Sequence, residues 1–113
     1  MVNTISLKKN REFVKAYKKG TFYAGRKIVI YLLKNNENIN RLGVTTVKNF
    51  GSSVLRNRMR RLIKENYRLI ETKIETGWDI VFLIRKIDRQ SIPEYKDIEK
   101  EMKYLLRKTG VME

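Results

Sequence analysis

The chain has 113 residues, with 26 Lys and Arg against 12 Asp and Glu and a net charge of +14, which is the size of one compact domain. It contains no cysteine and no histidine, so disulfides, thiolate metal sites, histidine-ligated zinc sites and histidine-based triads are excluded. With 42% hydrophobic residues, the chain can bury a core, and disorder is not expected despite the charge.

The first part of the chain predicts a helix followed by two strands. The helix runs from about Asn10 to Lys19 and ends at a glycine, and residues 20–25 are expected to form a loop. Residues 27–33 are apolar on both faces, and residues 41–48 follow a polar connection. We therefore expect two strands that pair antiparallel.

The second part predicts a helix, a strand and a helix. A long helix opens at residues 51–53 and reaches about Lys73, and Gly77 precedes a third strand over residues 78–84. The last helix begins near Pro93 and ends near Gly110, with apolar residues at helical spacing. The predicted order is αββαβα, in a single domain over residues 1–113.

Neither a membrane span nor a signal peptide is indicated. No apolar run approaches the roughly 18–20 residues needed to cross a bilayer. Residues 1–6 also lack the basic and apolar regions of a signal peptide. We therefore expect a cytoplasmic protein.

The positive charge is concentrated in the first 70 residues, which carry the whole excess of +14, whereas the last 43 hold nine basic and nine acidic side chains. Such asymmetry is typical of a surface that binds a polyanion. An anionic membrane is the competing partner. Membrane-surface helices, however, place Trp, Phe and Leu opposite the basic face, and these residues do not also form a protein core. Nucleic acid is therefore favoured.

The long helix separates apolar from basic side chains in helical projection. Its predicted core side consists of Leu55, Met59, Leu62, Ile63, Leu69 and Ile70. The opposite arc consists of Asn57, Arg60, Arg61, Lys64 and Arg68, flanked by Arg56 and Arg58, with Glu65 as the single carboxylate near its boundary. A solvated face is the plain alternative, but such faces usually carry Glu at i,i+4 to Lys or Arg, because neighbouring like charges repel. The one-signed arc predicts phosphate binding.

A family resemblance is carried by this helix. Residues 50–65 read Phe-Gly-Ser-Ser-Val-Leu-Arg-Asn-Arg-Met-Arg-Arg-Leu-Ile-Lys-Glu and resemble the signature of the bacterial ribonuclease P protein subunit. The resemblance covers nearly the whole chain and includes Glu12-Phe13, Tyr31, Arg41-Leu42-Gly43 and Gly77-Trp78-Asp79. It departs where the family usually has Ser-Lys-Lys, since this chain reads Val47-Lys48-Asn49, and at Ser53, where the family prefers alanine.

The resemblance implies an α+β fold of the α/β sandwich type, with a small central sheet and a left-handed crossover through the basic helix. Most such crossovers are right-handed. It further implies a subunit of the endoribonuclease that removes the 5′ leader of precursor tRNA, with catalysis by an RNA subunit that holds most of the Mg²⁺. The implied partners are this RNA and the leader, with no membrane and no small-molecule substrate.

The resemblance also implies roles for particular residues. The residues expected to bind the RNA subunit are Lys48, Arg56, Asn57, Arg58, Arg60, Arg61, Lys64 and Arg68. Those expected to stack on leader bases are Phe13, Tyr17 and Tyr31. No catalytic side chain or metal ligand is expected in the protein, because its only aspartates, Asp79, Asp88 and Asp97, lie in the neutral part of the chain.

Several alternatives stay open at the level of the sequence. The three rings could simply belong to the core, and Phe22 and Tyr23 could either contact RNA or not. Trp78 is expected to pack rather than bind. The charge asymmetry would equally fit a non-catalytic RNA-binding protein, such as a ribosomal protein, or a protein that places the basic helix in a DNA major groove.

Overall fold

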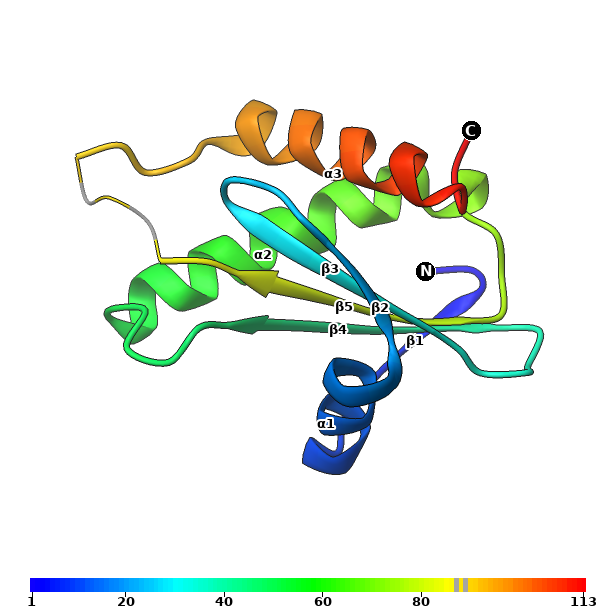
Figure 1. The fold of residues 1–113 in the computed structure, drawn as a ribbon. Helices are drawn as coiled ribbons and strands as arrows, with labels where there is room; N and C mark the ends of the chain where they lie inside the picture. The colour runs from blue at the N-terminus through cyan, green and yellow to red at the C-terminus, as the bar shows by residue number, and fades with distance from the viewer. Residues whose placement is uncertain (87, 89) are drawn as a thin grey trace.

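The computed structural model describes residues 1–86, 88 and 90–113, which fold into a five-stranded sheet and three α-helices (Figure 1). The strand order across the sheet is β1-β4-β5-β3-β2. In chain order the elements are β1 (Thr4–Ser6), α1 (Asn10–Lys19), β2 (Thr21–Ala24), β3 (Ile28–Lys34), β4 (Asn40–Thr46), α2 (Ser53–Ile70), the 3-10 turn η1 (Glu71–Lys73), β5 (Trp78–Ile84) and α3 (Tyr95–Thr109).

The centre of the sheet is β5, which runs parallel to β4 and antiparallel to β3. The predicted antiparallel pairing of β3 with β4 is therefore wrong, because β5 lies between them. Its sequence is apolar on both faces and almost entirely buried, as a central strand requires. Periodicity indicates such a strand but does not indicate its neighbours.

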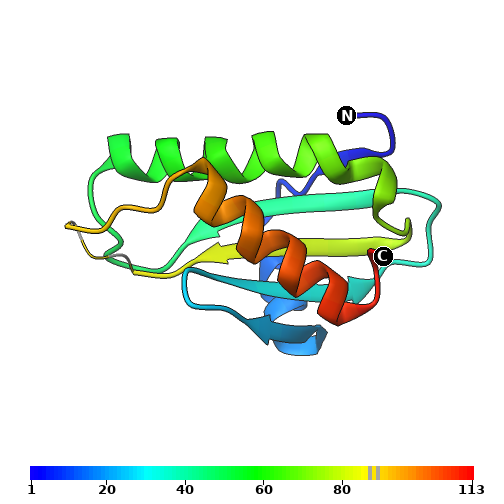
Figure 2. The same ribbon diagram turned by 90° about the horizontal axis from the view of Figure 1, so that it is seen from above.

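The α2 helix connects the parallel strands β4 and β5. In Figure 2, which looks onto the sheet from the side of α2, both strands run to the left and the chain passes from β4 down to β5. The crossover is therefore left-handed, as the family resemblance implies and against the usual preference.

Two short edge strands were not predicted. The segment expected to be a loop contains β2, whose Phe22 pairs with Tyr31 of β3, and β1 pairs in parallel with β4 through Ile5 and Arg41. Each has four residues or fewer. Segments of that length carry too little alternation to be recognised, and they become strands only because a neighbouring edge supplies hydrogen bonds.

The helices divide the molecule into three layers (Figures 1 and 2). Both α2 and α3 cover one face of the sheet, and α1 covers the other. The main core lies between the sheet and the α2–α3 pair and includes Ile63, Phe82 and Met102, all fully buried. A smaller cluster of Leu7, Ala16 and Val81 lies beneath α1, with Phe13 and Tyr31 packed against it. Among the described residues, no helix is long and apolar enough to cross a membrane.

The buried side of α2 is rotated slightly from its predicted position. Leu69, which was expected in the core, is 66% exposed, whereas Tyr67 is fully buried. The Tyr67 hydroxyl lies 2.8 Å from the Thr4 hydroxyl in a buried hydrogen bond. Because its polar end has this partner, the large ring can be buried without an unsatisfied group.

Candidate RNA-binding surfaces

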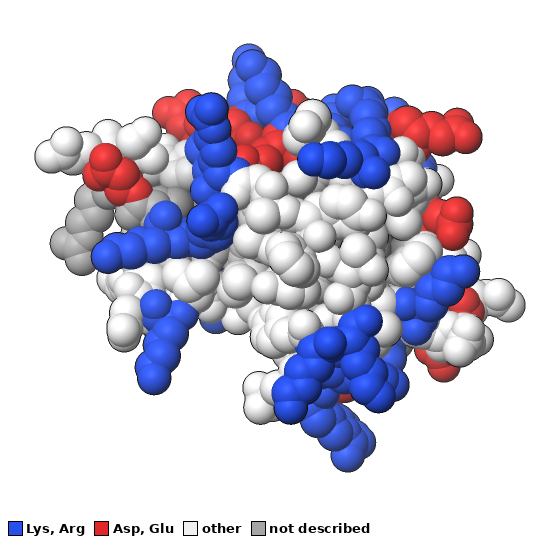
Figure 3. Space-filling model, in the orientation of Figure 1, with Lys and Arg blue, Asp and Glu red and all other residues white. Residues whose placement is uncertain are grey.

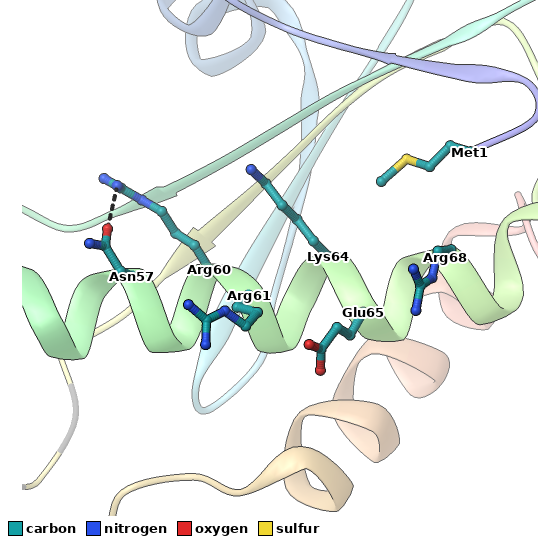
Figure 4. A pocket seen from close by; sticks show the side chains of 7 residues that line it. All are labelled: Met1, Asn57, Arg60, Arg61, Lys64, Glu65 and Arg68. Atoms are coloured by element: carbon teal, nitrogen blue, oxygen red, sulfur yellow. Dashed lines mark hydrogen bonds between the residues drawn. The ribbon is translucent and has the colours of Figure 1, made fainter.

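A basic surface lies along the outer side of α2. The helix begins after Ser52, whose Oγ accepts a hydrogen bond from the Leu55 N–H at 3.2 Å. Farther along, five predicted RNA-binding side chains line one surface depression of about 440 Å³, together with Met1 and Glu65 (Figure 4). We call them the α2 basic face: Asn57, Arg60, Arg61, Lys64 and Arg68.

The cations of the α2 basic face are free to bind an anion. Arg60 and Lys64 point one way from the helix, while Arg61 and Glu65 point the other (Figure 4). In the part of the chain that the structure describes, none of the lysines and arginines of α2 forms an ion pair. The Arg60 Nε is buried and has no hydrogen-bond partner there. The Arg60 Nη1 donates only a long hydrogen bond, 3.5 Å, to the Asn57 Oδ1. Guanidinium groups in this state suit phosphate oxygens.

The remaining three predicted RNA-binding residues lie apart from this face. Arg58 borders a second depression of about 350 Å³ that includes Val54 and Ile92. Arg56 is half-buried and does not line the first depression, and Lys48 is exposed in the connection between β4 and α2. The structure thus brings five of the eight predicted side chains together.

The N-terminal segment borders the α2 basic face because Glu71 binds it. The Glu71 carboxylate accepts hydrogen bonds from the backbone N–H groups of Val2 at 2.9 Å and Asn3 at 3.1 Å. Burial would raise the pKa of Glu71, but hydrogen bonds from the Thr4 hydroxyl and these N–H groups hold the pKa below its usual value. No local sequence signal connects Glu71 with residues 68 and 69 positions away.

An aromatic surface lies on the opposite side of the sheet. The rings of Tyr17 on α1 and Tyr31 on β3 meet edge to face, with centroids 4.9 Å apart and planes at 72°. Tyr17 is 37% exposed, and Tyr31 is half-buried. Burial is the main cause that raises the pKa of the Tyr17 phenol, so the hydroxyl is neutral at physiological pH. We call Phe13, Tyr17 and Tyr31 the aromatic face.

Phe13 is the member of the aromatic face that packs most deeply. Its ring lies on Gly43 of β4, where a Cβ atom would come within 2.6 Å of the Phe13 Cε1. Only glycine at position 43 lets α1 approach the sheet this closely. Phe13 also packs against the small cluster under α1, so it combines a structural role with its predicted binding role.

Arg41 fixes α1 over the sheet. Its guanidinium forms two hydrogen bonds to the buried Asp79, at 2.7 and 2.8 Å, and one to Glu12 of α1 at 2.7 Å. The hydrogen bond from the Lys9 N–H is the largest cause that lowers the pKa of Glu12, and the Arg41 charge adds to it. The hydrogen bond with Asp79 raises the pKa of Arg41. This triad holds the aromatic residues of α1 at a set position.

The surroundings of the aromatic face are basic on one side. Figure 3, with the β2 edge toward the viewer, shows an uncharged centre and a group of Lys and Arg side chains over α1. The exposed cations of α1 are Arg11, Lys15, Lys18 and Lys19.

Trp78 packs against the main core, as predicted, with its Nε1 donating to Glu75 at 3.2 Å.

The comparisons with known proteins agree with one another. A family model described as Ribonuclease P matches residues 1–110. The chain is 45% identical over 106 residues to a ribonuclease P protein component of Clostridium botulinum (strain Langeland), covering 93% of this chain and 94% of that protein. It is 44% identical over 109 residues to that of Clostridioides difficile, covering 96% and 94%.

Solved structures show the same fold. The RNase P protein of Staphylococcus aureus superposes with a TM-score of 0.81 at 31% identity, covering 96% of this chain and 97% of that one. The RNase P protein of Thermotoga maritima superposes with a TM-score of 0.78 at 23% identity, covering 91% and 96%. The mixed sheet with three helices is therefore a fold that solved proteins share.

Proposed function

The chain belongs to the ribonuclease P protein family, whose members are subunits of the endoribonuclease that removes the 5′ leader of precursor tRNA, and we propose that it serves this enzyme through two separate RNA-binding surfaces. The α2 basic face binds the catalytic RNA subunit, and the aromatic face binds the leader. The observation that carries the proposal is that several α2 cations, which form no ion pair among the described residues, line one depression. The alternative of a ribosomal protein is set aside by the family match.

The α2 basic face suits a folded RNA because it offers charge without a base-reading surface. Arg60, Lys64 and Arg68 lie at helical spacing along the depression, so they can contact successive phosphates of one backbone. Arg56, Arg58 and Lys48 extend the positive field beyond the depression. We propose that they add to the RNA contact at its margins rather than at its centre.

The aromatic face suits unpaired bases. Stacking on a ring requires a base that has left its helix, which is the state of a single-stranded leader. Tyr17 presents an exposed ring that Tyr31 supports edge to face, and the exposed cations of α1 lie beside it for the leader phosphates. Phe13, held against Gly43, would contribute mainly by positioning α1.

We propose that the RNA subunit, rather than the protein, holds the catalytic Mg²⁺. Mg²⁺ in a protein needs several converging oxygen ligands, and the described residues contain no group of three or more acidic side chains that could hold a metal ion. Asp79 is bonded to Arg41, and Asp97 caps α3 through the Glu94 N–H at 2.9 Å. The role left to the protein is to bind and orient RNA.

Reconstitution tests the proposal. The purified protein alone should not cleave precursor tRNA, and its addition to a bacterial ribonuclease P RNA should lower the Mg²⁺ concentration that cleavage requires. The double variant Arg60→Ala plus Lys64→Ala should lose this effect. A matched control, Lys96→Ala plus Lys100→Ala, removes the same charge from exposed positions on α3 and should retain it. Equal loss in both variants would contradict the assignment of α2.

A further inference from the structure

A fourth aromatic ring adjoins the aromatic face. Phe22 of β2 is 63% exposed, and its ring centroid lies 6.0 Å from that of Tyr31 at an interplanar angle of 39°. Its neighbour Tyr23 is half-buried and packs against the main core on the other side of the sheet. Successive residues of a strand point to opposite faces, so Phe22, and not Tyr23, belongs to the side of α1.

Phe22 ends a cross-strand row on the α1 side of the sheet. The strand register places Gly43 of β4 beside Val81 of β5, Val81 beside Tyr31 of β3, and Tyr31 beside Phe22 of β2. Phe13 covers Gly43, and Tyr17 stands against Tyr31. Phe22 is thus the position of the row that α1 leaves most open.

The exposure of Phe22 is not explained by the core. Single exposed apolar side chains are common, but the exposed ring of Phe22 adjoins the rings of the aromatic face, and the pairing of β2 with β3 is made by the backbone. Exposed cations lie close to Phe22 in the chain, with Lys18 and Lys19 before it and Arg26 after it. An exposed ring next to other rings and among cations is the arrangement that binds single-stranded nucleic acid.

The place of Phe22 in the sheet indicates which nucleotide it would meet. The α2 helix packs against β4, whereas β2 is the far edge of the sheet, beyond β3 (Figure 2). This inference rests on the proposed function: a leader that starts from catalytic RNA on α2 would cross the sheet from the β4 side and pass Tyr31 before Phe22. We propose that Phe22 adds a stacking position for an upstream leader base, so that this protein distinguishes precursors by leader length.

The experiment uses holoenzyme reconstituted with each variant and precursor tRNAs whose leaders grow one nucleotide at a time. Phe22→Ala should lower affinity for the longer leaders by at least about fivefold, the lower end for one lost base stack. It should leave the shortest leaders and mature tRNA unchanged. Tyr17→Ala should lower affinity from shorter leader lengths onward, because Tyr17 lies nearer the start of the path.

Four further variants separate stacking from other effects. Tyr104→Ala removes an equally exposed ring, 63%, from α3 on the other face, and it should not change leader binding. Phe22→Trp should keep the affinity for long leaders, and Phe22→Leu should lose it, because leucine is apolar but cannot stack on a base. Phe22→Thr keeps a residue that favours strands and should behave like Phe22→Ala, with an unchanged thermal midpoint.

The outcomes distinguish this inference from the proposed function. If Tyr17→Ala and Tyr31→Ala lower the affinity for precursors but Phe22→Ala has no effect at any leader length, Phe22 is not a stacking position. An equal loss at all leader lengths, or a loss shared by mature tRNA, would also overturn the inference. If none of the Tyr17, Tyr31 and Phe22 variants changes the affinity for precursor tRNA at any leader length, the aromatic face itself is wrongly assigned.

Discussion

The α2 basic face and the aromatic face, which we propose bind RNA in different ways, have different relations to the fold. The basic face stands on the outer side of a helix whose inner side packs on the main core, so its cations do not belong to the core cluster. The aromatic face shares Phe13 and Tyr31 with the small cluster under α1. Substitutions in the α2 basic face should therefore change RNA binding without changing stability. Substitutions in the aromatic face should change both in part.

The strongest coupling between binding and stability is expected at Phe13. Phe13→Ala should lower the free energy of unfolding by about 3 kcal/mol, as truncation of a packed aromatic ring does, and should weaken leader binding as well. Gly43→Ala should also lower the free energy of unfolding and weaken leader binding, because its Cβ would collide with the Phe13 ring. Chemical denaturation measures the first effect. An unchanged denaturation midpoint in both variants would show that Phe13 has no structural role.

Tyr17 and Tyr31 should affect precursor binding more than stability. Tyr17→Ala and Tyr31→Ala should each weaken holoenzyme affinity for precursor tRNA by about 1–3 kcal/mol, the value of a lost base stack. Mature tRNA has no leader and should bind almost unchanged. If the rings are only core, each truncation should instead cost about 3–5 kcal/mol of folding stability, and both RNAs should lose affinity together. Titration of both RNAs at one salt concentration, with a melt of each variant, decides between these outcomes.

The α2 basic face should show binding without a stability effect. Arg60→Ala plus Lys64→Ala should weaken binding to the RNA subunit and reduce the slope of log affinity against log salt by roughly 1.5 to 2, because two phosphate contacts are lost. The thermal midpoint should hardly change, since neither residue forms an ion pair within the described residues. An unchanged salt slope would mean that this face is only solvated.

The smallest effect concerns pH and the anchor of α1. The pKa of Glu12 is lower in the folded protein than its ordinary value of 4.5, so the unfolded state binds the proton more readily. The stabilisation is complete at pH values well above 4.5 and is lost as the pH falls through the lowered pKa. The difference in Tm between the wild type and Glu12→Gln should accordingly shrink on acidification. A difference that stays constant down to the acid range would show that ionised Glu12 does not stabilise the fold.

Much of the basic face could be predicted from the sequence, because it depends on local periodicity. The spacing of Met59, Ile63 and Ile70 fixes the buried side of α2 and thereby the position of Arg60 and Lys64. The C-terminal end of this buried side was harder to predict. Leu69 is exposed, whereas Tyr67 is buried and its hydroxyl is hydrogen-bonded to Thr4, 63 residues away.

Features that depend on distant pairing could not be predicted. The position of β5 between β3 and β4, the existence of β2 and the contact of Glu71 with the N-terminal segment each join parts of the chain that share no local pattern. Phe22 lay in a predicted loop, where an aromatic residue has no defined direction. The pairing of Phe22 with Tyr31 in β3 defines the direction of its side chain.

The central position of β5 has a consequence for how the protein is made. A ribosome releases β3 and β4 together with their edge partners β2 and β1, but both lack their central neighbour until residues 78–84 emerge. A nascent chain that ends before Trp78 carries nearly the whole surplus of positive charge but lacks the central strand of the sheet. We expect such a fragment to unfold without cooperativity. The contacts between strands distant in sequence should form only once β5 is available. Stepwise truncation with a cooperativity measurement would locate that threshold.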